Sequence, residues 1–249
     1  MEAHAADSSL KGKLRRRYAR LVRRRPVRGA LERPMVSFCF DDAPASAAET
    51  GAAILEKRDL KGVYYISAGL AGREGPMGRN ADAVDIERLI AQGREIGCHT
   101  HSHLDCGQAS AQAIADDVLK NKAALTGLGA PAPRSFAYPY GDVSLQAKRV
   151  LGPRFELLRA LHHGLVRRGQ DLNQAPAVGI EGKDGEAAAW RWLDRAISEN
   201  AWLILYTHDV SETPSQWGCT PAALERLVEG ALSAGADVVT VAQGCARLG

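Results

Sequence analysis

The stretch MVSFCFDD, residues 35–42, is the clearest guide to the fold of this chain of 249 residues. Its first six residues are mostly apolar and predict a buried strand, and two carboxylates, Asp41 and Asp42, follow directly. Because a carboxylate is costly beside apolar surface, two of them at a strand end indicate a use, such as a metal ligand and a base. The alternative is that the pair caps the next helix and interacts with its dipole.

Strand-like and helix-like segments alternate from residue 35 to the end of the chain. Such repeated βα units predict an α/β fold with a parallel sheet or a barrel surrounded by helices. We expect strands at 35–40, 62–66, 134–138, 155–162, 201–207 and 237–241. We expect helices at 46–58, 85–95, 110–128, 146–151, 186–198 and 221–234, with Gly97 breaking the second of them.

Polar residues follow several of these strands at the point where each strand ends. The carboxylate pair follows the first strand, the segment 139–142 follows the third, and His208 with Asp209 follows the fifth. In barrel-like α/β folds the carboxyl ends of the strands share one face, and active sites are built there. We therefore expect these distant residues to meet.

The run HTHSH, residues 99–103, adds metal-binding chemistry. His99 and His103 are four residues apart and can direct their imidazoles at one ion. Two neutral imidazoles and one carboxylate are a common set for a catalytic divalent metal that keeps open positions for water and substrate. The alternatives are that the run is a polar turn with satisfied hydrogen bonds, and that His208 is a buried, hydrogen-bonded histidine.

Four pieces in order resemble the polysaccharide deacetylase domain, also called carbohydrate esterase family 4 or the NodB-homology domain. They are SFCFDD at 37–42, HTHSH at 99–103, FAYPYG at 136–141 and LILYTH at 203–208. The resemblance covers roughly residues 35–246. It implies a single-domain, distorted (β/α)7-type barrel with a bound divalent metal, with zinc as the first choice and cobalt, nickel or manganese as alternatives.

The resemblance also implies roles for individual residues. Asp41 matches the family's general base, and His208 matches the general acid. The implied metal ligands are Asp42, His99 and His103, whereas His101 lies outside the family's pattern. Tyr140 and Pro139, both in the third motif, are implied to form the substrate and oxyanion part of the site, with the backbone N–H of Tyr140 stabilising the oxyanion together with the metal.

The chain departs from the family pattern in two places. Many members have an arginine that pairs with the base at the position of Ala137, so the sequence leaves the orientation of Asp41 open. The family's fourth motif has only a weak candidate here, Asp171. For the wall of an acetyl pocket the candidates are Trp202, Leu203 and Trp217, with core packing as the alternative.

The N-terminal segment is strongly basic. Residues 11–33 contain eleven lysines and arginines against one acid, Glu32, whereas the rest of the chain is net negative. We divide the chain into an arm at 1–33 and a deacetylase domain at 34–249. Apolar residues at helical spacing predict a helix that ends at Pro26; they are Leu14, Tyr18, Leu21 and Val22.

Three interpretations of this arm stay open: a solvated tail, a helix on an anionic membrane surface, and a nucleic-acid contact. The last is disfavoured because aromatic residues are not interleaved with the charges beyond Tyr18. If the arm is a helix on an anionic membrane, deleting residues 1–33 should release the protein from anionic vesicles and leave turnover of a soluble acetylated sugar intact.

Five scattered cysteines without C-x-x-C spacing argue against a disulfide framework and indicate a reducing compartment. Residues 1–10 have no apolar segment typical of a secretory signal, and no apolar run is long enough to span a bilayer. We therefore expect a cytoplasmic protein, peripheral on the inner face of the membrane.

The expected reaction is the release of acetate from N-acetylhexosamine units of an exopolysaccharide or a lipid-linked oligosaccharide precursor. Two alternatives stay open. One is a related amidohydrolase of small cyclic amides or ureides, and the other is a glycan- or membrane-binding module with an inactive site.

Overall fold

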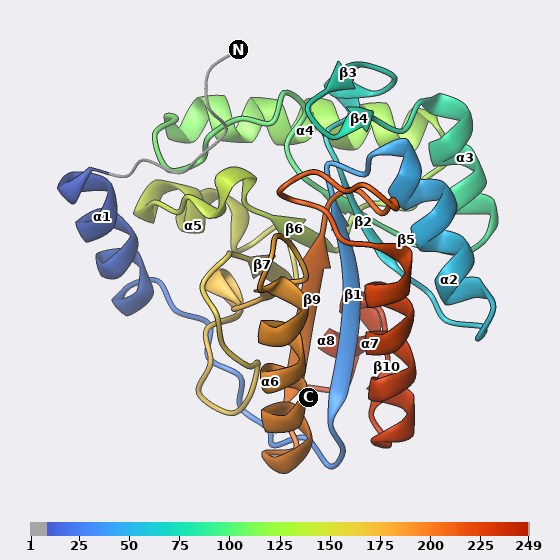
Figure 1. Ribbon diagram of the computed structural model, residues 1–249. Helices are drawn as coiled ribbons and strands as arrows, with labels where there is room; N and C mark the ends of the chain where they lie inside the picture. Colours follow the sequence, from blue (N-terminus) through green and yellow to red (C-terminus); the bar gives the residue numbers. More distant parts are fainter. Residues whose placement is uncertain (1–8, 249) are drawn as a thin grey trace.

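A computed structural model describes residues 9–248 of the chain. Its centre is a parallel sheet built on β1, Met35–Asp41, which is buried along its whole length. The sheet order is β7-β6-β5-β2-β1-β9-β8, with β10 beside β1 (Figure 1). The remaining strands are β2 Val63–Ile66, β5 Glu95–Cys98, β6 Ser135–Ala137, β7 Leu157–Arg159, β8 Val178–Gly179, β9 Trp202–Thr207 and β10 Asp237–Val238.

The sheet curls toward closure. β1 pairs with β9 over Met35–Phe40 and with β2 over Cys39–Asp41, and all ladders of this sheet are parallel. At the far edge Arg159 bridges to Ala175, which precedes β8, so the two outer strands approach each other. This curled half-barrel in a single domain confirms the expected distorted (β/α)7-type fold.

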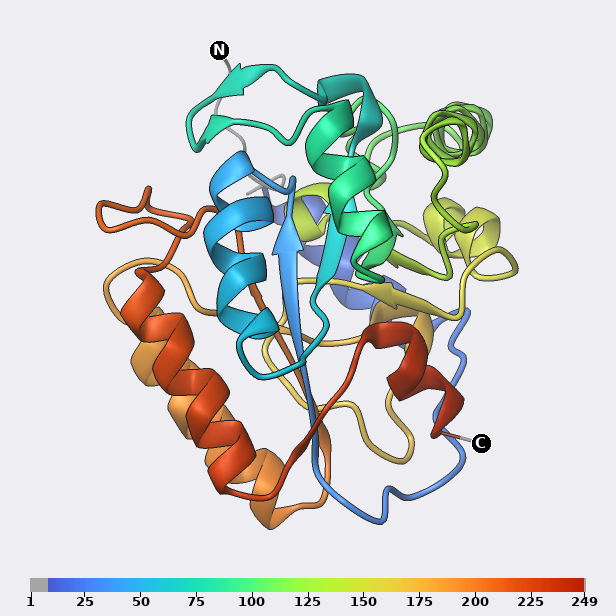
Figure 2. The ribbon, with the colours of Figure 1, turned by 90° about the vertical axis from the view of Figure 1, so that its right-hand side faces the viewer.

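Helices cover the outside of the sheet (Figure 2). The polar residues at 46, 82, 110, 144 and 220 stand where the sequence turns from loop to helix, and most of their side chains cap the helix that follows. Within residues 9–248, no helix is both long and apolar enough to cross a membrane. The helices are α1 Leu10–Leu21, η1 and α2 Ala47–Glu56, α3 Ala83–Ala91, α4 Ala111–Gly127, α5 Leu145–Leu151, α6 Gly185–Ser198, α7 Pro221–Ser233 and α8 Val241–Ala246.

The prediction for residues 85–98 was partly wrong. The helix ends at Ala91, and Glu95–Cys98 forms strand β5 next to β2. Gly97 does not break the structure; it stands where a Cβ atom would lie 2.4 Å from the Tyr65 ring. A glycine inside a strand, where it leaves room for a neighbouring side chain, was therefore mistaken in the sequence for a residue that ends a helix.

The C-terminal strand is also shorter than predicted. It ends at Val238, and Thr240 then caps helix α8 through a capping box with Gln243. Short elements escaped the sequence patterns as well, namely β8 and the hairpin of β3 Glu74–Gly75 and β4 Gly78–Arg79.

The N-terminal helix ends at Leu21 and not at Pro26, because Val22 is already extended. The chain then runs along the body: Val27 N–H donates to Gln170 O at 2.8 Å. The Arg25 guanidinium donates to three carbonyl groups, those of Gly152, Phe155 and Glu156. The basic segment is thus held against the body of the protein.

Candidate active site and metal centre

The strand ends carry the predicted site residues, except Pro139, into one pocket of about 550 Å³. In Figure 2 the β1 arrow points to the end of the molecule that carries the β3–β4 hairpin. Hairpin residues, including Met77 and Gly78, form one wall of the pocket. The polar lining includes all the proposed acid, base and ligand side chains, Asp41, Asp42, His99, His103 and His208.

Three of these side chains form a group that fits one metal ion. His103 Nε2 lies 3.4 Å and His99 Nε2 lies 3.7 Å from Asp42 Oδ1. The ligand atoms of all three residues lie within 4.8 Å of one another. Tetrahedral zinc ligands at about 2.1 Å from the ion are about 3.4 Å apart, so these positions suit a divalent cation with little movement.

His99 is prepared for ligation by its surroundings. Its Nδ1 lies 2.8 Å from the carbonyl oxygen of Ala137, so Nδ1 carries the proton and Nε2 faces Asp42. Burial lowers the pKa of His99, although the charges of Asp42 and Asp41 oppose that shift. Both effects of the site, the fixed tautomer and the lowered pKa, favour a neutral imidazole that can bind a metal.

The loop that presents the histidines is strained and tightly held. Thr100 and His103 have φ values of 61° and 57°, in the left-handed region that non-glycine residues rarely adopt. The carboxylate of Asp117 accepts from the backbone N–H of His101 at 2.6 Å, which fixes the turn. His101 is outside the metal-ligand group, and its ring faces Gly69.

The two acids at the end of β1 have different surroundings. Asp42 and Ala43 adopt left-handed φ values of 55° and 45°, which turn the chain sharply after the strand. Asp41 is only 3% exposed, and its Oδ2 accepts from Arg159 Nη2 at 2.5 Å. Within residues 9–248 its Oδ1 accepts no hydrogen bond. Asp41 therefore has one oxygen held by a cation and one available to the pocket.

Arg159 holds Asp41 in the orientation that the sequence left open. Ala137, where many relatives have arginine, pairs with Arg159 on the neighbouring strand β7. The guanidinium is fully buried between the rings of Tyr65 and Tyr206, at 5.2 and 5.0 Å from their centroids. Burial lowers the pKa of Arg159, but Asp41 together with Tyr65, Cys39 and Tyr206 outweighs it, so the net shift is upward. The guanidinium that pairs with Asp41 therefore comes from β7, the strand next to the one that carries Ala137.

The sequence carries a signal for Arg159 outside the four motifs. It is the lone basic residue inside the apolar run of 157–161. A buried guanidinium needs a partner, so an arginine within a predicted strand points to a buried acid.

His208 is oriented by a second acid, Glu181. His208 Nδ1 lies 3.2 Å from the Trp217 carbonyl oxygen and 3.3 Å from Glu181 Oε2. Tyr206 donates its hydroxyl to Glu181 Oε1 at 3.0 Å and holds that carboxylate in place. Burial lowers the pKa of His208. Glu181, Asp41 and Asp42 together raise it by more than burial lowers it, so that the pKa is about 9. Glu181 follows the unpredicted strand β8, which is why it was missed.

Tyr140 lies on the pocket wall, and its motif partner Pro139 does not. Tyr140 has a φ of 59°, and the centroid of its ring is 4.5 Å from that of His103. Pro139 is buried at the start of the same turn and does not line the pocket. Its part is therefore to shape the turn that presents Tyr140.

The remaining candidates separate clearly. Trp217 lines the pocket, whereas Trp202 and Leu203 are fully buried in the core. Asp171 is outside the pocket, because its carboxylate accepts from Lys148 Nζ at 2.6 Å and from the Arg25 backbone N–H at 2.8 Å. It holds the N-terminal segment in place.

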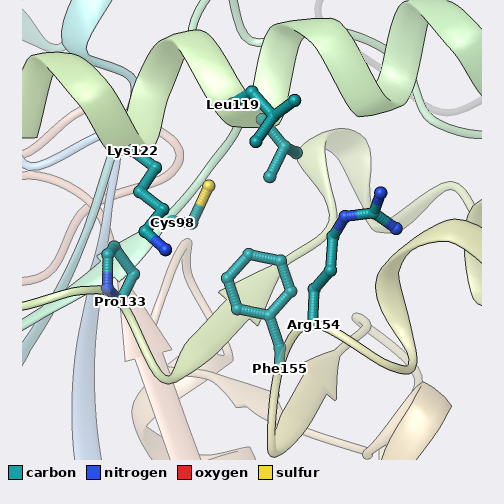
Figure 3. Close-up of a pocket in the computed structure, with 7 residues that line it drawn as sticks. Cys98, Leu119, Lys122, Pro133, Arg154 and Phe155 are labelled. Atoms are coloured by element: carbon teal, nitrogen blue, oxygen red, sulfur yellow. The ribbon is translucent and has the colours of Figure 1, made fainter.

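A second cavity, of about 270 Å³, lies beneath helix α4 (Figure 3). Its lining contains the Cys98 thiol and two cations, Lys122 and Arg154, but no carboxylate or imidazole. Burial raises the pKa of Cys98 to about 11, so the thiol is protonated at neutral pH. This cavity therefore lacks the carboxylate and imidazole groups that line the larger pocket.

Comparison with known proteins identifies the family and the fold. A sequence model described as polysaccharide deacetylase matches residues 28–152. The bifunctional xylanase/deacetylase of Pseudobutyrivibrio xylanivorans is 21% identical over 212 residues. The match covers 84% of this chain but only 30% of that protein, so the chain spans less than a third of its length.

Solved structures share the fold. A chitin deacetylase from the fungal pathogen Colletotrichum lindemuthianum has a TM-score of 0.63 at 17% identity, covering 87% of this chain and 89% of that one. A family 4 pseudoenzyme from Bacillus anthracis has a TM-score of 0.61 at 16% identity, covering 88% of this chain and 67% of that one. At such identities the likeness concerns the fold alone.

Proposed function

Because the chain belongs to the polysaccharide deacetylase family, we propose that it hydrolyses N-acetyl groups on N-acetylhexosamine units of a glycan and releases acetate. One observation carries the proposal. A buried, arginine-paired carboxylate and a glutamate-paired imidazole, Asp41 and His208, line the same pocket as a three-residue metal-ligand group.

Asp42, His99 and His103 would hold the divalent cation, with zinc as the first choice. When bound there, such a cation lowers the pKa of water and polarises an acetyl carbonyl. The donor set of two imidazoles and one carboxylate leaves positions for water and substrate. Cobalt, nickel and manganese suit the same donors and remain alternatives.

Asp41 would act as the general base. Its Oδ1 is free of hydrogen bonds from residues 9–248 and can accept the proton of the attacking water. Arg159 holds the other oxygen, which fixes the direction of the free one. The backbone N–H of Tyr140 would donate to the oxyanion of the tetrahedral intermediate.

His208 would donate a proton to the departing nitrogen of the sugar. With a pKa of about 9, it is mostly protonated at neutral pH and can act as an acid. An amine is a poor leaving group unless it is protonated, whereas an ester alcohol depends less on an acid. The charged pair of His208 with Glu181 therefore favours amide hydrolysis.

The substrate class proposed is a bacterial exopolysaccharide or its lipid-linked precursor. The exposed hairpin residues Arg73 and Glu74 on the pocket wall suit a hydroxyl-rich chain that extends beyond the acetylated unit. The alternatives are the hydrolysis of small cyclic amides or ureides, and an inactive module. The pseudoenzyme among the related structures makes the last one a necessary control.

The test is acetate release from chitooligosaccharides after EDTA treatment and after Zn²⁺ is added back. We expect activity to disappear with EDTA and return with zinc in the wild type. The Asp41→Asn variant should stay inactive under both conditions, because it lacks the base. Full activity without metal would contradict the mechanism, and no acetate from any acetylated glycan would favour the alternatives.

A further inference from the structure

Helix α1 is fixed on the body by buried polar contacts at two points. Arg15 and Arg16 donate to the buried carboxylate of Asp142 at 2.5 and 3.2 Å. At the C-terminal end of the helix, Lys148 Nζ donates to the carbonyl oxygens of Ala19 and Val22 at 2.6 and 2.7 Å. Two separate contacts fix the rotation of the helix about its axis.

The face that this rotation turns to the body carries small residues, since Gly12 and Ala19 are the buried positions of the helix. The opposite face carries the large apolar side chains, which we call the apolar stripe. Amphipathic helices on a globular protein normally turn their apolar face inward, and α1 does the reverse. The stripe consists of Leu10, Leu14, Tyr18 and Leu21, which are 79%, 64%, 57% and 77% exposed.

Positive charge borders the apolar stripe. At 100° per residue, Lys11 lies on one side of it, and Lys13, Arg17 and Arg20 lie on the other. All four are exposed, and there is no acidic residue from position 9 to position 31. An exposed apolar face between rows of cations is typical of helices that lie in a membrane interface.

We infer that the apolar stripe docks α1 onto an anionic lipid bilayer, parallel to its surface. The cations would meet the lipid headgroups, and the four apolar side chains would enter the boundary with the acyl chains. A polyanionic glycan or a nucleic acid would use the charges but leave the stripe in water. A bilayer uses both features, and therefore it is the partner that the surface fits.

The docked helix lies beside the active site. Asp142, which Arg15 and Arg16 hold, is two residues from Tyr140 on the pocket wall, and two residues of chain span at most about 7 Å. Figure 1 shows α1 at the edge of the molecule, outside α5. Bilayer docking would thus place the wall of the pocket next to the membrane-bound helix. The docking of α1 does not depend on the proposed function. The further step, turnover of a lipid-linked glycan at this surface, rests on the proposed function.

The experiment is co-sedimentation with vesicles of equal parts phosphatidylglycerol and phosphatidylcholine, and with phosphatidylcholine vesicles as reference. We expect wild-type protein to bind the anionic vesicles. The double variant Leu14→Glu/Leu21→Glu should bind at least about tenfold more weakly, because it places anions in the apolar stripe. Its melting temperature and its acetate release from a soluble chitooligosaccharide should match the wild type.

Point substitutions are needed because a deletion of residues 1–33 would also remove the partners of Asp142 and Lys148. The expectation that a deletion leaves turnover intact treats the arm as separable, whereas these contacts join it to the body of the protein. The matched control is Val84→Glu/Leu119→Glu, which adds the same charges at exposed apolar positions, 69% and 56% exposed, on other helices. It should bind like the wild type.

Three results would overturn the docking proposal: no binding by the wild type, equal binding by the Leu14→Glu/Leu21→Glu variant, or an equal loss in the control. A different result would indicate a contact with a polyanion instead. In that case salt would abolish the binding of the wild type, and the Leu14→Glu/Leu21→Glu variant would bind as well as the wild type. Vesicle binding without acetate release from any glycan would contradict the proposed function and leave the docking intact.

Discussion

Asp41 and His208 each have a dedicated partner of opposite charge, and the partners come from strands that hold no family motif. Arg159 lies at the end of β7, and Glu181 follows β8. Both lie outside the four motifs, but both contact a residue within them. At the scale of single residues, the proposed base and acid are therefore each oriented by a side chain that lies outside the motifs.

Replacing Arg159 by glutamine should leave Asp41 buried without a cation. Breaking a buried ion pair typically costs about 3–5 kcal/mol in unfolding free energy, and a misoriented base lowers kcat on the order of a hundredfold. The measurements are thermal melting and acetate release. Arg167→Gln, which removes an exposed pair with Glu199, should change neither.

A rescue variant separates the role of the arginine from a general loss of stability. Ala137 and Arg159 are directly paired across β6 and β7, so their side chains lie on the same face of the sheet. Ala137→Arg/Arg159→Ala should therefore regain part of the activity that Arg159→Ala loses. If both variants are equally inactive while equally folded, Arg159 does not act by orienting Asp41.

Replacing Glu181 by glutamine should change the pH dependence of the reaction. Glu181 is the strongest influence that raises the pKa of His208, which is about 9. The general acid works while protonated, so activity should fall as pH rises through this pKa. In Glu181→Gln we expect the alkaline limb of kcat/KM to move down by about one pH unit or more. An unmoved limb would show that another group sets it.

At the scale of elements, small residues decide where strands can approach each other. β5 contains Gly97, and its neighbour β2 presents the ring of Tyr65 at this position. The contact keeps β5 in register, and the histidine loop begins directly after this strand. The packing of one glycine thus contributes to the position of His99.

Gly97→Ala should be destabilising. Its Cβ would lie 2.4 Å from the Tyr65 ring, and overpacking of this kind costs about 1–3 kcal/mol. Gly127→Ala, at a position of α4 where an added Cβ meets nothing within 4 Å, should instead stabilise by about 0.5–1 kcal/mol. Urea denaturation of both variants measures the difference. Equal unfolding free energies would contradict the packing argument.

Across the whole molecule, the sequence predicted the α/β architecture and the meeting of the strand-end motifs, because both follow from long periodic segments and from fixed motif order. Strands β5 and β8 were missed because each is short and interrupted by glycine or followed by polar residues. The sequence could not predict which face of α1 turns toward the body. An apolar face normally turns inward, but here the buried contacts of Asp142 and Lys148 determine the orientation of the helix. Tertiary contacts of this kind leave no local pattern.

The measurement that bears most directly on the metal centre is the zinc content of the purified protein after equilibration with Zn²⁺ and removal of the excess, determined by mass spectrometry. We predict one tightly bound zinc per chain in the wild type and a loss of this zinc in His99→Ala/His103→Ala. Cysteine thiols can also bind zinc, and all five cysteines of this chain are free. Cys98→Ser is therefore a suitable control, and it should keep the zinc. A wild type without zinc, or a double variant that binds as much as the wild type, would contradict the metal centre and the mechanism built around it.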